Sequence, residues 1–264
     1  MNTCTLIRED LARIIIPYKD IDTTVYLLRT PQGMVLFDTA SSDEDMEQYL
    51  RPAVVELNWS LDDLRYIFIS HNHRDHAWGL GWVTKAAPEA MVVSRCPKIY
   101  EDYPGRVICP EDGDSLLDVL RVVTIPGHTA DSAALLDTRD GTLITGDCLQ
   151  LFGIFGSGLW GANITLPAEH FQAIEKVRAM DVKTILCAHE YHPLGRVISG
   201  RSVAAALDAC VEPLMWIRQL IVNHPELDDE QIVARYHEDV YLPTVPPKVA
   251  AAMRRALEEG AIAR

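Results

Sequence analysis

The sequence predicts an α/β fold in which two β-sheets face each other and helices cover their outer sides. Three observations predict this fold: short runs of Val, Ile, Leu and Tyr bounded by Gly, Pro and Asp, helical periodicity between some of these runs, and their division into two strand-rich halves. The chain has 264 residues, of which 48% are hydrophobic and 23% are charged. A chain of this length can bury one large core and carry a small appendage.

The short apolar runs are predicted strands, and they follow one another through the first two thirds of the chain. They span residues 12–16, 24–29, 34–37, 66–69, 91–93, 106–109, 119–125, 133–136, 142–144 and 184–187. Helices are predicted over residues 43–56, just after residue 76, and after Pro167. In the last of these, Phe171, Ile174 and Val177 recur on one face.

The composition changes near residue 202, beyond which the sequence contains no convincing strand. Leu207, Val211 and Leu214 begin a series of apolar residues at helical spacing, and prolines then precede a last amphipathic segment. We therefore expect two parts. Residues 1–201 form the strand-rich domain, and residues 202–264 form a helical C-terminal appendage.

The charge and cysteine content exclude several classes of protein. The 24 Lys and Arg residues against 38 Asp and Glu residues give a net charge of −14, which disfavours nucleic acid as a partner.

No apolar stretch approaches the roughly 20 residues that span a bilayer, and the N-terminal residues lack the apolar core of a signal peptide. The six cysteines form no C-x-x-C pair. We expect a cytoplasmic, reduced protein without a membrane partner, with a homo-oligomer left open.

The chemistry of the sequence is concentrated in an H-x-H-x-D-H motif that follows the apolar run 66–69. It consists of His71, His73, Asp75 and His76. In an extended turn, residues two apart project to the same side, so His71 and His73 can share one ion. Asp75 and His76 lie where a helix would begin and can face a second ion. Imidazole and carboxylate ligands together suit Zn²⁺, with iron or manganese also possible.

Further ligand-type residues come just after other predicted strands. His128 follows the run 119–125, Asp147 follows 142–144, and His189 follows 184–187. Asp38 follows the run 34–37 in the same way. Because strand ends meet at the edge of a sheet, these side chains are expected to gather with the H-x-H-x-D-H motif in one crevice. Packing alone would not place a His or an Asp at so many strand ends.

This set resembles the pattern of the metallo-β-lactamase superfamily over roughly residues 10–200. The resemblance implies an αββα sandwich, extended here by the helical appendage, with the metal ions at its edge. It implies that one ion is held by His71, His73 and His128, and the other by Asp75, His76 and His189. It also implies that Asp147 bridges the two ions and that Asp38 orients a ligand histidine without binding metal.

We expect the protein to be a hydrolase with two zinc ions and a small-molecule substrate. In this hypothesis a hydroxide that bridges the ions attacks a carbonyl, Asp147 bridges the ions, and Asp75 accepts the hydroxide proton. The stretch from Cys187 through His189 to Tyr191 is similar to a stretch of glyoxalase II enzymes, which hydrolyse a glutathione thioester. That resemblance implies that Tyr191 contacts substrate. A thioester, an ester or a lactone is therefore expected.

Other reactions of the same superfamily remain open. Persulfide dioxygenases hold a single iron with two His and the bridging Asp, and nucleases or phosphodiesterases share the H-x-H-x-D-H motif. Acyl-homoserine lactonases carry a Tyr three residues after the bridging Asp, where this chain has Gln150. A complete set of ligands for a second ion favours hydrolysis over iron-dependent oxidation.

Several residues are weaker candidates for lining the substrate. Residues 151–161 interleave glycines with Phe152, Phe155 and Trp160, which is typical of a mobile surface loop or of a flexible apolar wall over a site. His192 lies three residues after His189 and could also contact substrate. The remaining histidines are predicted to have surface or helix-capping roles: His170, His224 and His237.

Overall fold

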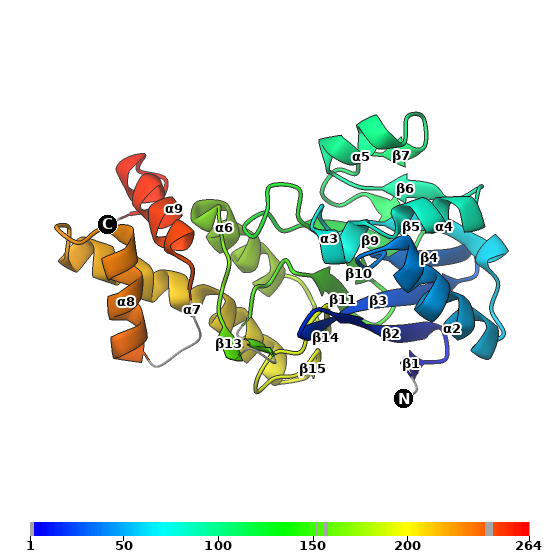
Figure 1. Ribbon diagram of the computed structural model, residues 1–264, viewed down its shortest axis with the longest axis horizontal. Coiled ribbons are helices and arrows are strands. Elements are labelled where there is room, and N and C mark those ends of the chain that lie inside the picture. The colour runs from blue at the N-terminus through cyan, green and yellow to red at the C-terminus, as the bar shows by residue number, and fades with distance from the viewer. Residues whose placement is uncertain (1–2, 152, 156–157, 241–244, 264) are drawn as a thin grey trace.

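Two β-sheets stacked face to face form the centre of the fold, and helices lie on both outer sides (Figure 1). The structure is a computed structural model and describes residues 3–151, 153–155, 158–240 and 245–263. The α/β sandwich that the sequence predicts is confirmed. Within the described ranges, no helix is both long and apolar enough to cross a membrane.

The first sheet contains seven strands, which neighbour one another in chain order. They are β1 (Cys4–Arg8), β2 (Leu11–Tyr18), β3 (Ile21–Thr30), β4 (Gly33–Phe37), β5 (Leu64–Phe68), β6 (Met91–Val93) and β7 (Val107–Ile108). The strands from β1 to β4 pair antiparallel, whereas β4, β5, β6 and β7 pair parallel. The carboxyl ends of β4 and β5 therefore lie at the same edge of the sheet.

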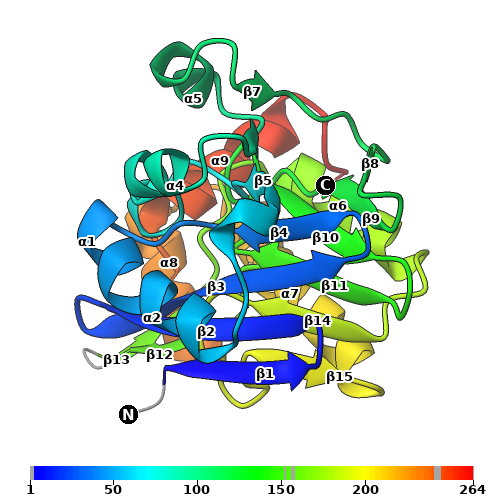
Figure 2. The same ribbon diagram turned by 90° about the vertical axis from the view of Figure 1, so that its right-hand side faces the viewer.

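The second sheet has six strands in the order β15-β14-β11-β10-β9-β8. They are β8 (Ser115–Leu116), β9 (Leu120–Thr124), β10 (Ala133–Asp137), β11 (Thr142–Gly146), β14 (Thr184–Cys187) and β15 (Val197–Ser199). Strands β11 and β14 are parallel, so their carboxyl ends also share an edge. Figure 2, which faces the first sheet, shows β10, β11 and β14 behind β2, β3 and β4. A separate hairpin pairs β12 (Gly153–Phe155) with β13 (Gly158–Trp160).

The helices cover both sheets and build the C-terminal end of the molecule. They are α1 (Asp43–Asp45), η1 (Met46–Leu50), α2 (Arg51–Glu56), η2 (Leu61–Asp63), α3 (Arg74–Ala77), α4 (Leu80–Ala86), α5 (Pro97–Asp102), α6 (Pro167–Arg178), α7 (Ser202–Asn223), α8 (Asp229–Val240) and α9 (Pro247–Glu258). The helix predicted over residues 43–56 is formed by α1, η1 and α2, which follow one another without a break. Strands β1, β8, β12, β13 and β15 were not predicted, because they are short, and β1, β8 and β15 are also partly exposed.

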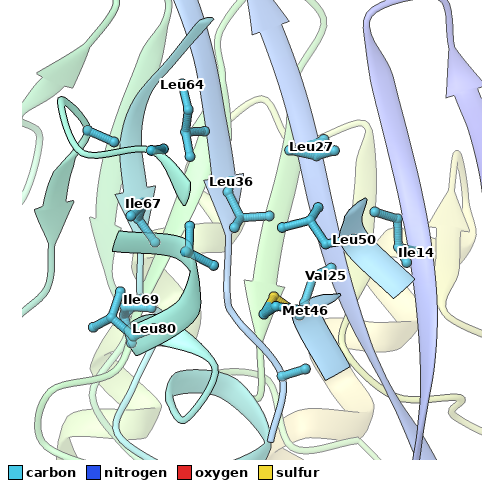
Figure 3. Packing of buried hydrophobic residues seen from close by; sticks show 14 of the residues in the cluster. Ile14, Val25, Leu27, Leu36, Met46, Leu50, Leu64, Ile67, Ile69 and Leu80 are labelled. Atoms are coloured by element: carbon cyan, nitrogen blue, oxygen red, sulfur yellow. The ribbon is translucent and has the colours of Figure 1, made fainter. Parts of the chain in front are cut away.

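Alternate residues of the strands enter different hydrophobic cores, because successive side chains point to opposite faces of a sheet. In β3, Val25 and Leu27 face the helices on the outer side, whereas Tyr26 and Leu28 face the second sheet. Figure 3 shows the outer cluster, in which Met46, Leu50 and Leu80 from the helices lie over strand residues such as Leu36 and Ile67. Both faces of the sheet are therefore anchored, which fixes the positions of the strand ends.

The C-terminal helices lie at one end of the molecule, away from α2 and α4 (Figure 1). Helix α7 belongs to two cores. Its first half contributes Val203, Leu207 and Cys210 to the core beneath the second sheet, and its second half packs through Leu214 and Ile217 against α8 and α9. The division of the chain into domains 1–201 and 202–264 stays a prediction, since α7 connects the two parts continuously.

Candidate metal centre

The H-x-H-x-D-H motif joins the end of β5 to the start of α3. His73 has extended backbone angles (φ −82°, ψ 156°) and directly precedes the helix, so His71 and His73 lie in an extended turn. Asp75 and His76 lie in the short helix that follows. The backbone N–H of Thr39 donates to the carbonyl of His76 over 2.6 Å, which ties this helix to the loop after β4.

Three histidines form the first cluster. The Nε2 atoms of His71 and His128 each lie 2.9 Å from Nδ1 of His73. His71 and His128 are buried, whereas His73 is exposed on the open side of the cluster. Burial lowers the pKa of each of these histidines below its ordinary value, and for His71 it does so strongly. The cluster therefore offers neutral imidazoles, which is the form that binds a metal ion.

Asp75, His76 and His189 form the second cluster. The Nε2 atoms of His76 and His189 each lie 3.4 Å from Oδ2 of Asp75. Burial opposes the charged form of both histidines, but the carboxylates of Asp75 and Asp147 outweigh it and raise the pKa of His76 and His189. A cation in this cluster would therefore compete with protons for the two histidines.

Asp147 lies between the two clusters and presents one oxygen to each. Its Oδ1 is 3.1 Å from Nε2 of His189 and 3.6 Å from Nε2 of His76, while its Oδ2 is 3.8 Å from Nε2 of His128. Burial opposes ionisation of Asp147, but His189 and His76 outweigh burial and hold the pKa of its carboxyl well below its usual range. Asp147 is thus an ionised carboxylate shared by both clusters.

Asp38 lies behind His76, outside the ring of converging ligand atoms. It is fully buried and accepts hydrogen bonds from Nδ1 of His76 (2.8 Å), the backbone N–H of Ser70 (2.8 Å) and the Ser70 hydroxyl (2.9 Å). The bond to Nδ1 leaves Nε2 of His76 facing the cluster. Gly146 makes this packing possible, because a Cβ at this position would lie 2.4 Å from Ser70 Oγ.

Backbone carbonyls hold the two histidines that come from the second sheet. His128 Nδ1 donates to the carbonyl of Asn163 over 2.7 Å, and His189 Nδ1 donates to the carbonyl of Asp22 over 2.7 Å. Both bonds leave Nε2 pointing to the centre. No side-chain pattern in the sequence marks Asn163 and Asp22, because any residue type can supply a backbone carbonyl.

Arg196 fixes the strand that carries Asp22. Its guanidinium is almost fully buried and donates to Asp22 Oδ1 (2.7 Å), Thr24 Oγ1 (2.8 Å) and Glu190 Oε2 (2.7 Å). Glu190 follows His189 directly, so Arg196 connects both sides of this histidine. Arg196 lies seven residues beyond His189 and belongs to no motif, so the sequence alone does not mark it.

The residues of the centre fit divalent metal ions. The ligand atoms within each of the two clusters lie within 4.8 Å of one another, and a further group, His71, His76 and Asp147, joins them. Nε2 of His76 and Oδ1 of Asp147 are buried beside charged partners, yet neither forms a hydrogen bond of normal geometry to the part of the chain that the structure describes. Buried polar atoms without such a bond are costly, and coordination of a cation would satisfy both.

The residues predicted to line the substrate lie in different surroundings. Tyr191 is 1% exposed and packs in the core beneath the second sheet, where burial raises the pKa of its phenol well above the usual range. His192 is exposed. Phe152 lies outside the described residues. The backbones of Phe155 and Trp160 form β12 and β13, but their side chains also lie outside the described part. Their contact with substrate stays a prediction.

His170 corrects the expectation of a surface or capping role. Its side chain is fully buried on α6, 3.3 Å from the carbonyl of Cys210 on α7, and it packs so closely on Gly127 that a Cβ there would lie 2.4 Å from Nδ1 of His170. Helical spacing alone did not reveal this, because a residue on a helix can face either solvent or a second helix. His170 thus supports the loop that carries His128.

We expect His170 to make the protein less stable in acid. Burial lowers its pKa from 6.5 to about 4. Between these pH values, His170 therefore binds a proton in the unfolded chain but not in the folded chain. The free energy of unfolding should fall by about 3 kcal/mol as the pH drops from 6.5 to 4, through this group alone. Chemical denaturation of the metal-free protein and of the His170→Gln variant across this range measures the contribution. An equally steep pH dependence in the variant would contradict it.

Comparisons with known proteins support the resemblance to the metallo-β-lactamase superfamily. Residues 19–95 match the model of the metallo-beta-lactamase superfamily. A hydroxyacylglutathione hydrolase of Vibrio campbellii is 29% identical over 69% of this chain and 63% of its own length, and one of Photobacterium profundum is 34% identical over 47% of each chain. The chain thus spans less than two thirds of the length of these curated relatives.

Solved structures show the same fold at low sequence identity. A metallo-beta-lactamase family protein from Thermus thermophilus superposes with a TM-score of 0.67 at 17% identity, and the match covers 98% of this chain and 97% of that one. A flavodiiron protein from Giardia intestinalis gives a TM-score of 0.64 at 18% identity, over 78% of this chain and 58% of its own. The family match over residues 19–95 and the ligand pattern therefore support the metallo-beta-lactamase superfamily, and the solved structures show that the chain shares its fold.

Proposed function

We propose that this protein is a metal-dependent hydrolase that uses two divalent ions to cleave an acyl bond in a small molecule. The observation that carries the proposal is the position of Asp147, whose two carboxylate oxygens face different histidine clusters. A single-ion centre would need only one of these clusters. The second cluster of Asp75, His76 and His189 is complete, which favours two ions over one.

The arrangement of the side chains suits attack on a carbonyl carbon. Two divalent ions held by the clusters would supply a hydroxide at neutral pH and polarise the acyl oxygen. Asp147 would hold both ions, because its two carboxylate oxygens face different clusters. Burial opposes ionisation of Asp75, but His76 outweighs it and lowers the pKa of the carboxyl, so Asp75 is available to accept a proton from the nucleophile. Exposed His73 marks the side from which substrate enters.

The proposed substrate is a thioester, with an ester or a lactone as related possibilities. The hydroxyacylglutathione hydrolases among the relatives support a thioester, although this chain spans less than two thirds of their length. All three substrate types share an acyl carbon that becomes tetrahedral and an oxygen that becomes negative. Two divalent ions carry more positive charge than Asp75 and Asp147 return, so the centre would stabilise that oxygen within an acidic protein.

Metal analysis combined with a substrate panel tests the proposal. We expect about two zinc ions per chain in the purified protein and turnover of thioesters above that of lactones and phosphodiesters. One iron per chain with oxygen consumption on persulfides would overturn it in favour of a dioxygenase. Two zinc ions with turnover of phosphodiesters alone would overturn it in favour of a nuclease or phosphodiesterase.

Removing the metal should lower stability as well as activity. Ions that bind only the folded chain contribute about 4 kcal/mol each to the free energy of unfolding at 1,000 times their dissociation constant. Dialysis against a chelator should therefore lower the midpoint of thermal unfolding and abolish hydrolysis, and added zinc should restore both. Unchanged melting and turnover in a chelated sample with no measurable metal would contradict the proposed metal dependence.

A further inference from the structure

Gln150 is a buried polar residue whose side chain connects the loop after β11 to the segment that precedes α6. It lies three residues after Asp147, is 1% exposed and has a positive φ of 44°. A non-glycine residue in this backbone region is uncommon, and here it turns the side chain amide inward. The sequence marked Gln150 only as a departure from the Tyr of acyl-homoserine lactonases.

Both ends of the Gln150 amide are used. Its Nε2 donates to the carbonyl of Asp147 over 3.1 Å, and its Oε1 accepts from the backbone N–H of Asn163 over 2.8 Å. An amide is suited to this position because it offers a donor and an acceptor at once. The side chain thereby connects the loop after β11 to the segment that precedes α6.

Asn163 connects Gln150 to His128, because its backbone N–H binds Gln150 and its carbonyl binds His128. The carbonyl of Asn163 accepts from Nδ1 of His128 over 2.7 Å, and Nε2 of the same ring lies 2.9 Å from Nδ1 of His73. Thr165 reinforces the contact, because its hydroxyl donates to the carbonyl of His128 over 2.9 Å. The segment from Asn163 to Thr165 therefore sets the direction in which His128 presents Nε2.

We propose that Gln150 is a positioning residue that orients His128 toward the first metal ion. Among the described residues, the hydrogen bonds of its amide go to backbone atoms of Asp147 and Asn163 and not to a ligand atom. It acts by fixing the carbonyl of Asn163 relative to the backbone of Asp147, and this fixes both the orientation and the protonated nitrogen of His128. The inference rests on the proposed metal centre, but it does not depend on which acyl compound is the substrate.

Residues other than Gln150 orient His189 in the second cluster, so we expect a change at Gln150 to affect the first cluster. His189 donates to the carbonyl of Asp22, and Asp22 is held by Arg196. None of these bonds involves Gln150. A change at Gln150 should therefore weaken the binding of one ion and leave the binding of the other unchanged.

The Gln150→Met variant tests this, because methionine has a similar length and lacks both polar groups. Metal-free protein is titrated with zinc in competition with a chromophoric chelator, which measures the two dissociation constants separately. We expect the dissociation constant of the ion held by the first cluster to rise about tenfold, which is the usual effect of losing a partner that orients a metal ligand. The dissociation constant of the other ion should stay within a factor of two. At limiting zinc kcat/KM should fall, and excess zinc should restore it.

Thr84→Val is the matched control for loss of a buried hydrogen bond. The Thr84 hydroxyl donates to the carbonyl of Leu80 over 2.9 Å in α4, outside the centre. We expect the control to keep both zinc affinities. If Gln150→Met keeps both affinities, or if Thr84→Val loses the same affinity, the positioning role is wrong. A wild-type protein that binds no zinc would instead overturn the proposed metal centre.

Gln150→Glu provides a second variant should the methionine protein fail to fold. Glutamate keeps an acceptor for the backbone N–H of Asn163 and loses the donor to Asp147. We expect it to fold and to lose affinity for one zinc ion, because one of the two connections is broken. Wild-type affinity for both ions in a folded Gln150→Glu protein would contradict the proposal.

Discussion

Replacing Asp147 with asparagine is expected to reduce hydrolysis more than 100-fold and to lower the metal content from two ions to one or fewer. Partners that merely orient a ligand contribute about 10- to 100-fold to metal affinity, so a residue facing both ion positions should contribute more. The two oxygens of Asp147 face His189 and His128, on opposite sides. An amide keeps the shape of the side chain but replaces one of these oxygens with a group that cannot bind a cation.

Elemental analysis and initial rates measure the effect, and Asp118→Asn is the control. Asp118 is exposed and accepts from Nε2 of Gln32 over 3.1 Å, away from the centre. The control should retain its metal and its turnover. Full metal content together with full turnover in Asp147→Asn would show that this carboxylate does not bridge two ions.

Replacing Asp38 with asparagine is expected to lower affinity for one ion by about 10- to 100-fold, with a corresponding loss of turnover at limiting metal. Asp38 accepts from Nδ1 of His76 and from both donors of Ser70. The amide nitrogen of an asparagine would face at least one of these donors, so a buried polar atom would lose its partner and the ring of His76 would be free to turn. Zinc titration of the metal-free variant measures the change.

Asp45→Asn is a closely matched control for this experiment. Asp45 also accepts from a serine backbone N–H and the same serine's hydroxyl, at 3.0 Å and 2.6 Å from Ser41, and among the described residues it forms no hydrogen bond with a histidine. Both variants lose charge and similar hydrogen bonds. If Asp45→Asn lowered zinc affinity as much as Asp38→Asn, the effect would come from general destabilisation and not from the orientation of His76.

Much of the candidate centre could be predicted because its ligand residues follow strands directly. His71 lies just beyond β5, Asp147 directly follows β11, and His189 comes two residues after β14. Short apolar strands are visible in a sequence, and the parallel pairs β4/β5 and β11/β14 bring their carboxyl ends to a common edge. The local shape of the H-x-H-x-D-H motif, an extended turn followed by a helix, was also predictable, because the motif follows an apolar strand that is visible in the sequence.

The supports of the centre could not be predicted in this way. Asn163 and Asp22 act through backbone carbonyls, which every residue carries, so side-chain type gives no signal. Gln150 and Arg196 act through side chains whose partners lie far away in the sequence. Their roles become visible only when both sheets are stacked and the loops at their edge are in contact.

The sequence by itself determined the fold class and the candidate ligand residues of the centre, because strand periodicity and ligand spacing are local properties. Tertiary structure decided which nitrogen of each histidine faces inward, since that depends on hydrogen bonds from the opposite side of the ring. It also decided that Tyr191 and His170 are buried, because exposure depends on which elements pack over a residue. The αββα arrangement thus brings residues from five strand ends together in one candidate metal centre.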